Sequence, residues 1–102
     1  MDGPFYGKFR GIVEDSRDPL GLARLKASVP EALGEEPSAW AMPCMPFTSP
    51  ESEGTLAIPP VGTNVWIEFE HGDPRQPIWS GCFWTTAPDV PNLTASPSLP
   101  AS

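Results

Sequence analysis

The side chains best suited to acid, base or metal chemistry lie in one short stretch, around the only histidine of the chain. Glu70, His71 and Asp73 lie close together, and an imidazole beside carboxylates is a common set of metal ligands. A single histidine is a weak basis for a metal site, however. The order His-Gly-Asp-Pro is typical of a turn, because glycine, aspartate and proline each favour turn backbone. We therefore expect a turn here and no bound metal.

Signatures of catalysis are also sparse. Glu68 and Glu70 fall on one face of a predicted strand and could mimic a catalytic carboxylate pair, but two acids on a solvated strand are more often surface charge. Ser16, Ser38 and Ser80 lack the glycine elbow that exposes a nucleophilic serine. We expect neither enzyme activity nor a cofactor.

The charge balance bears on possible partners. Thirteen acidic residues against six basic ones give a formal net charge of −7, which disfavours nucleic acid because phosphate binding needs positive charge. Four basic residues alternate with other residues in the first two predicted strands and could form one positive stripe: Lys8, Arg10, Arg24 and Lys26. The stripe is either a solvated barrel face or a docking surface for an acidic partner.

The elements that position these side chains must be short strands. Fifteen prolines and nine glycines leave no long helical window. We expect strands over 6–15, 22–29, 39–43, about 65–70 and 78–84, the first two forming an antiparallel hairpin. The polar excursion 30–37 can hold one helical turn but has too little apolar surface to pack as a helix. Residues 47–54 are expected to form a loop, and 55–58 a brief strand.

This pattern predicts an all-β protein, a five-stranded Greek-key OB-fold barrel, with a small sandwich as the alternative. The expected organisation is an N-terminal arm over 1–5, the barrel over 6–84 and an extended, Pro-rich C-terminal tail over 85–102. Cys44 and Cys82 imply no disulfide framework and are expected as two small, partly buried thiols, with their pairing left open. The sequence shows no secretory leader and no apolar run of membrane-spanning length, so we expect cytoplasmic folding without stable membrane anchoring.

The aromatic side chains carry the main functional expectation. Val65, Ile67 and Phe69 alternate with Trp66, so if the three fill the barrel, Trp66 points outward. Three aromatic residues of the next predicted strand are expected to enlarge an exposed apolar patch around Trp66: Trp79, Phe83 and Trp84. We expect this patch to be an intersubunit or partner interface, unless a second layer or the tail covers it.

Several motifs together resemble a known family. They are Tyr6-Gly-Lys-Phe-Arg-Gly-Ile-Val, Asp18-Pro-Leu-Gly, Arg24-Leu-Lys-Ala-Ser-Val-Pro30, Ser38-Ala-Trp-Ala-Met-Pro43 and Pro59-Pro-Val-Gly-Thr-Asn-Val-Trp-Ile-Glu-Phe-Glu-His-Gly-Asp-Pro-Arg-Gln-Pro-Ile78. In this order they are similar to the barrel domain of phage baseplate central-spike proteins. The valine-glycine-repeat spike of type VI secretion and extracellular contractile injection systems contain the same module. The likeness covers Tyr6 to about Trp84.

The resemblance implies a non-catalytic structural part of a contractile tail baseplate or injection particle, assembled in the bacterial cytoplasm. It implies a homotrimeric collar that joins the hub and tail-tube proteins above to a cell-puncturing tip below, with the basic residues as a possible hub contact. The chain departs from larger members, since we find no repeat region and no room for an enzyme domain. The iron-binding tip of the family needs paired histidines, which His71 alone does not supply, although three copies of His71 could meet on a trimer axis.

A second reading from another class is a stand-alone OB-fold module that binds a saccharide or single-stranded nucleic acid. Trp66, Trp79 and Trp84 would then serve as stacking platforms. The acidic charge argues against the nucleic acid. A spike-borne hydrolase ranks third, because the sequence shows no nucleophile or acid pair for it.

Overall fold

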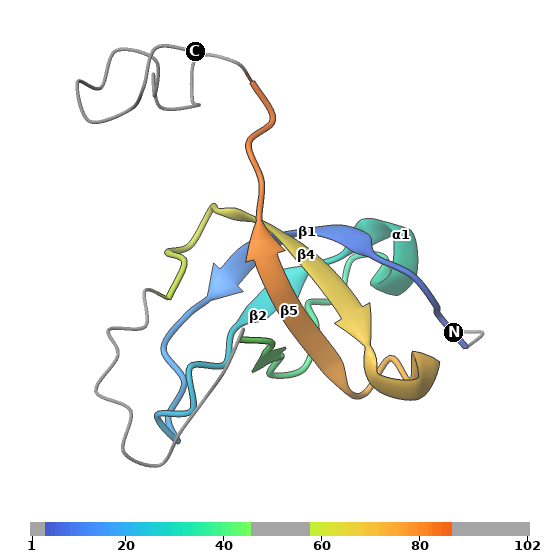
Figure 1. Cartoon of the computed structure of the whole chain (residues 1–102), viewed down its shortest axis with the longest axis horizontal. Coiled ribbons are helices and arrows are strands. Elements are labelled where there is room, and N and C mark those ends of the chain that lie inside the picture. Colours follow the sequence, from blue (N-terminus) through green and yellow to red (C-terminus); the bar gives the residue numbers. More distant parts are fainter. Residues whose placement is uncertain (1–3, 46–57, 87–102) are drawn as a thin grey trace, which may run out of the picture.

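The computed structural model describes residues 4–45 and 58–86. In this part of the chain, short strands are joined by turns and two single helical turns (Figure 1). The elements are β1 Phe9–Asp15, β2 Lys26–Ser28, α1 Pro30–Leu33, β3 Met42–Pro43, β4 Asn64–Phe69, η1 Glu70–Gly72 and β5 Pro77–Cys82.

The strands form one curled sheet of five in the order β2-β1-β4-β5-β3. Three neighbouring pairs are antiparallel, and β3 runs parallel to β5. Just outside the edge strands, Leu25 and Ala41 exchange backbone hydrogen bonds of 3.2 and 2.6 Å, so the two edges of the sheet meet. The expected all-β, OB-type barrel is confirmed.

The barrel interior is built from alternate residues of the strands. Val65 and Ile67 on β4 are fully buried and Phe69 is 6% exposed, as their alternation with polar residues predicts. Leu25, Ala27 and Val29 on and beside β2 are also fully buried on one face, as expected. Burying one large apolar side chain of this kind stabilises the fold by roughly 1.5–3 kcal/mol.

One glycine marks where three strands come closest. A Cβ at Gly11 on β1 would lie 3.1 Å from Cγ1 of Ile67 and 3.1 Å from the carbonyl oxygen of Ser28. These distances are tighter than ordinary Cβ contacts, so a side chain at this position would require its neighbours to shift. Glycine therefore permits the tight curl that the sequence pattern of β1 predicts.

The first strand is shorter than expected, because the residues before it act as a cap. Phe5 lies against Phe9 and Phe69, with ring centroids 5.9 Å away in each case. The Phe5 N–H donates to the Gly72 carbonyl at 2.9 Å. The segment therefore closes the end of the barrel near η1 instead of extending β1.

The helical turn also corrects an expectation. The prediction that the excursion carries too little apolar surface to pack is wrong, because Ala32 of α1 is 2% exposed and Leu33 packs against the core. Two apolar residues suffice for a helix of four residues. The turn plugs one end of the barrel beside β1.

Several predictions lie outside the described residues. They are the loop over 47–54, most of the brief strand over 55–58, and the tail beyond residue 86; Ile58 is not in a strand. The division of the chain into an N-terminal arm, a barrel and a C-terminal tail stays a prediction. No helix among the residues that the structure describes is long and apolar enough to span a membrane.

Candidate interaction surface

Trp66 lies on the outer face of β4, where it forms a stack with a residue from the end of β5. Its ring centroid is 4.5 Å from that of Phe83, and the two planes are inclined by 35°. Arg10, the register partner of Trp66 on β1, places its guanidinium carbon 5.5 Å from the Trp66 ring and 5.0 Å from the Phe83 ring. Cation–π attraction favours this arrangement. Residues of β1 and β4 and the residue after β5 thus form one aromatic surface with Arg10 beside it.

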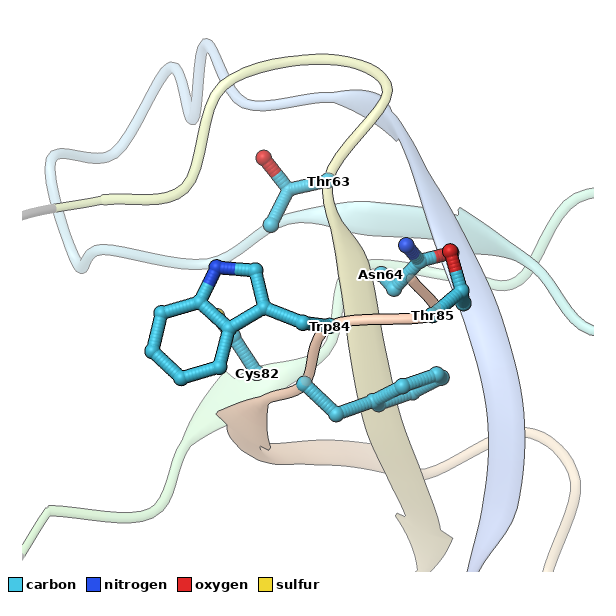
Figure 2. Close-up of a pocket in the computed structure, with 6 residues that line it drawn as sticks. Thr63, Asn64, Cys82, Trp84 and Thr85 are labelled. Carbon is cyan, nitrogen blue, oxygen red and sulfur yellow. The ribbon is translucent and has the colours of Figure 1, made fainter. Parts of the chain in front are cut away.

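Beside this stack, the surface is hollowed on both sides of Phe83. The first hollow, of about 270 Å³, is lined by residues that include Thr63, Asn64, Cys82 and Trp84 (Figure 2). The second, of about 280 Å³, reaches Ile12 on β1 and Pro30 at the start of α1. Both hollows are also lined by Asn64, Phe83 and Thr85, so we name them together the Phe83 groove.

The Phe83 groove is edged by large apolar side chains that no described residue covers. Trp84 is 59% exposed and Ile12 is 46% exposed. Figure 2 shows Trp84 and Thr85 on opposite sides of the start of β4, so the chain after β5 runs through the groove. A contiguous apolar area of this kind on a small domain typically marks an interaction site.

The prediction that Trp79 belongs to the exposed aromatic patch around Trp66 is wrong. Trp79 is 3% exposed, because it stands opposite the buried Ile67 in the β4–β5 ladder and shares its inward face. Its Nε1–H donates to the Ala23 carbonyl at 3.1 Å. Trp79 thus belongs to the core, which removes one of the three stacking platforms of the alternative binding module. An interface role for Trp66, Phe83 and Trp84 stays a prediction.

The expectation of one continuous positive stripe is wrong, whereas a hub-docking role for these basic residues stays a prediction. Lys8 forms an ion pair of 3.2 Å with Glu68 and donates to Ser80 Oγ. Lys26 stands opposite Asp15, five residues along β1 from Arg10, which separates the two by about 17 Å.

Instead, the second pair of basic residues surrounds another tryptophan. The Arg24 guanidinium carbon lies 5.6 Å and the Lys26 ammonium nitrogen 5.0 Å from the Trp40 ring. The basic residues therefore occupy separate places: Arg10 at the Phe83 groove, Lys8 at Glu68, and Arg24 with Lys26 at Trp40.

The β1–β2 connection contains an organising residue that sequence reasoning missed. The Asp18 carboxylate accepts hydrogen bonds from the backbone N–H groups of Leu20, Leu22 and Arg24, at 2.9, 2.9 and 3.1 Å. It also accepts from the Arg24 guanidinium, and this pairing holds the pKa of the Asp18 carboxyl well below its usual range. The only available signal was the Asp-Pro pair at the start of the turn.

This loop, Asp18 to Arg24, presents apolar side chains on a fixed backbone. Leu20 is 67% exposed and Leu22 is 48% exposed. Ala23 has a φ of 62°, which is unusual for a residue with a Cβ. Backbone strain of this kind persists only where surrounding contacts enforce it, and here the contacts come from Asp18 and Trp79.

The turn with the histidine carries no assembled metal site in the described part of the chain. His71 is exposed with a φ of 53°, and Asp73 pairs with Arg75 at 3.1 Å. Hydrogen bonding to Arg75 lowers the pKa of the Asp73 carboxyl. Among the residues described, no group of three or more histidine, cysteine or acidic side chains is arranged to hold an ion.

The two cysteines are unpaired, and both are exposed rather than partly buried as expected. They lie on the paired strands β3 and β5 or just beyond, where the Cys44 N–H donates to the Trp79 carbonyl at 2.9 Å. Neighbouring protein atoms partly desolvate the Cys82 sulfur, which raises the pKa of that thiol. This places a weakly reactive thiol in the first hollow of the Phe83 groove.

Comparison with known proteins identifies the family of this chain. Residues 9–84 match the family described as the type VI secretion system/phage-baseplate injector OB domain. A similar protein is the type VI secretion system spike protein VgrG4b of Pseudomonas aeruginosa, with 47% identity over 38 residues. That match covers 37% of this chain and only 5% of the relative. Because the family match runs from the start of β1 to Trp84, the chain belongs to the family of type VI secretion system and phage-baseplate injector OB domains.

Proposed function

We propose that three copies of this chain form a collar that joins the tail-tube hub of an injection machine to its membrane-puncturing tip. Membership of the spike OB family supports a structural spike component, without an enzymatic role. The single observation that carries the trimer is the outward-facing aromatic surface in which the half-buried stack of Trp66 and Phe83 adjoins the exposed Trp84. Tryptophan and arginine are the residues that most often dominate the binding energy of an interface.

A ring of three identical chains needs two different, complementary surfaces on each copy, because its contacts are head to tail. The Phe83 groove offers a concave apolar surface. The loop from Asp18 to Arg24 offers a second apolar surface, with Leu20 and Leu22 exposed on a backbone that Asp18 holds in place. These two surfaces are the candidates for the two sides of the subunit contact.

The partners of the collar would bind outside this contact. Arg24 and Lys26 around Trp40 supply positive charge on a chain whose net charge is −7. An acidic hub protein would be attracted there, and Trp40 would add apolar contact. In this proposal the collar assembles in the bacterial cytoplasm and ends in a virion baseplate or injection particle.

The mass of the purified chain in solution tests the trimer. Multi-angle light scattering after gel filtration, repeated over a hundredfold range of concentration, should give three chains at high concentration. A single chain at every concentration would contradict the collar. Particles purified through a tag on this chain should then also contain a hub protein and a tip protein. The identity of these two proteins distinguishes a phage from a secretion machine.

The tail offers a separate test of the adaptor role. Removing residues 89–102 should weaken assembly or the loading of the tip, because in the proposed collar this segment, which follows β5 in the sequence, contacts the trimer or the tip protein. Particles from the truncated chain would be compared with those from the full chain by electron microscopy and by their tip content. Normal particles with a normal tip content would remove the tail from the adaptor function.

A further inference from the structure

The segment beyond the barrel has a three-residue repeat in its sequence. From residue 88 it reads Pro-Asp-Val, Pro-Asn-Leu, Thr-Ala-Ser, Pro-Ser-Leu, Pro-Ala-Ser. Every proline stands at the first position of a triplet, and the aliphatic Val90, Leu93 and Leu99 all stand at the third. The second position holds small or polar residues throughout.

This spacing matches the geometry of a polyproline II helix, which has three residues per turn. Each position of the triplet then forms its own edge along the helix. One edge carries prolines, one carries the aliphatic residues, and one is polar. The sequence of the tail is thus that of an amphipathic polyproline II segment with two adjacent apolar edges.

The Phe83 groove begins where this segment begins. Thr85 lines both hollows, and Figure 1 shows the chain after β5 leaving the barrel beside the start of β4. The second hollow continues from Thr85 over Phe83 to Ile12 and on to Pro30. Crossing from β5 over β4 to β1 spans two strand spacings, about 10 Å, whereas seven residues of polyproline II helix span about 22 Å.

We propose that residues 87–93 of the same chain dock in the second hollow as a polyproline II helix, with Pro88, Val90, Pro91 and Leu93 against Phe83 and Ile12. Aromatic-lined grooves bind this conformation readily, since it loses little entropy on binding. A hollow of about 280 Å³ suits a few side chains of this size. Direct attachment at Thr86 gives the tail an effective concentration in the millimolar range, which favours it over a free ligand.

This docking goes beyond the collar and does not depend on it. It occupies the half of the Phe83 groove between Phe83 and α1, and leaves the half with Trp84 open to a neighbouring copy. A monomer in solution would therefore still show a docked tail.

Nuclear Overhauser effects in the full-length chain test the docking. We expect contacts from the methyl groups of Val90 and Leu93 to the Phe83 ring and to Ile12. Mixing labelled with unlabelled chains assigns each contact to one copy or to two. Contacts only between different copies would overturn docking within the same chain, and random-coil shifts for 87–93 without any contact would overturn docking altogether.

A pair of variants separates the apolar edges from the polar one. Leu93→Asp should abolish these contacts and shift the amide signals of Ile12 and Thr85, whereas the neighbouring Asn92→Asp should leave both unchanged. The two variants add the same side chain at adjacent positions, so a general effect of added charge would appear in both. Equal responses of the two variants would contradict the amphipathic geometry.

Discussion

The carboxylate of Asp18 and the guanidinium of Arg24 meet in a two-point ion pair, in which Oδ2 accepts from Nε at 2.9 Å and Oδ1 accepts from a terminal guanidinium nitrogen at 2.8 Å. The Asp18 side chain is only 3% exposed, and the same two oxygens accept from backbone N–H groups of the loop. The pair therefore fixes both the path of the β1–β2 connection and the place of Arg24 beside Trp40. Paired planar groups of this kind are geometrically specific as well as strong.

Asp18→Asn should lower the stability of the protein at neutral pH and change its dependence on pH. The folded state lowers the pKa of Asp18 from its usual 3.8, so at acidic pH the unfolded state binds more protons. The stabilisation that Asp18 gives to the folded state is then complete above about pH 4, and it is lost as the pH falls towards the pKa that Asp18 has in the folded protein. Urea unfolding from pH 7 to 2.5 should show the two proteins converging at the acidic end.

Asp73→Asn is the matched control for this experiment. The pKa of Asp73 is lowered by its partner Arg75, but the Arg75 side chain is 87% exposed, and surface pairs contribute little. Its effect should be smaller and should fade in salt. Equal losses of stability in Asp18→Asn and Asp73→Asn would argue against a special role for Asp18.

Trp79→Ala should cost about 3–5 kcal/mol in the free energy of unfolding, because it empties a large core position. Trp79→Phe should be less destabilising, because the ring still fills part of the core position, but it loses the hydrogen bond from Nε1 to the Ala23 carbonyl, worth about 1 kcal/mol. Trp66→Phe on the outer face should change the stability of the monomer by at most about 0.5 kcal/mol. Denaturant titrations at low protein concentration measure all three, and similar costs at positions 66 and 79 would contradict the burial of Trp79.

The sequence predicts the faces of β2 and β4 correctly, because their apolar residues alternate clearly. Val65 and Ile67 need only a local rule to be placed inside the barrel. The face of Trp79 follows instead from its partner Ile67 and from an indole acceptor 56 residues away in sequence, Ala23. Neither the register nor the acceptor can be inferred from the composition of β5.

The candidate site was predictable in part for the same reason. Trp66 could be placed on the outer face from strand alternation, but alternation would put Phe83 on the inward face of Trp79, and the proximity of Arg10 depends on the β1–β4 register. The single basic stripe failed because the β1–β2 register puts Lys26 opposite Asp15. The bonds of Asp18 require a loop conformation that the Asp-Pro pair suggests but does not specify.

Gly72→Ala should release the N-terminal cap of the barrel. A Cβ at this position would lie 2.6 Å from Cβ of Pro4 and 3.1 Å from the Phe5 nitrogen. Hydrogen exchange at the Phe5 amide, which donates to the Gly72 carbonyl, should become much faster. Gly62→Ala is the control: Gly62 also has a positive φ, of 94°, but has nothing within 4 Å. Both variants share the cost of a left-handed alanine, roughly 1–2 kcal/mol, so faster exchange at Phe5 in both would refute a specific cap.

Trp66→Glu should prevent the self-association that we propose. The stack on Phe83 would be lost, and a carboxylate in place of the indole, even beside Arg10, would have to be desolvated inside the subunit contact. Light scattering should then report one chain where the unmodified protein reports three. Near-ultraviolet circular dichroism would check that the barrel, whose core excludes this side chain, remains folded.

Trp40→Glu is the matched substitution at a tryptophan outside the Phe83 groove. Its ring is flanked by Arg24 and Lys26, so a carboxylate there gains basic neighbours and should leave the mass of the assembly unchanged. An unaltered mass for Trp66→Glu would exclude the outer face of β4 from the contact. Loss of association in Trp40→Glu alone would move the contact to the surface that we assign to the hub.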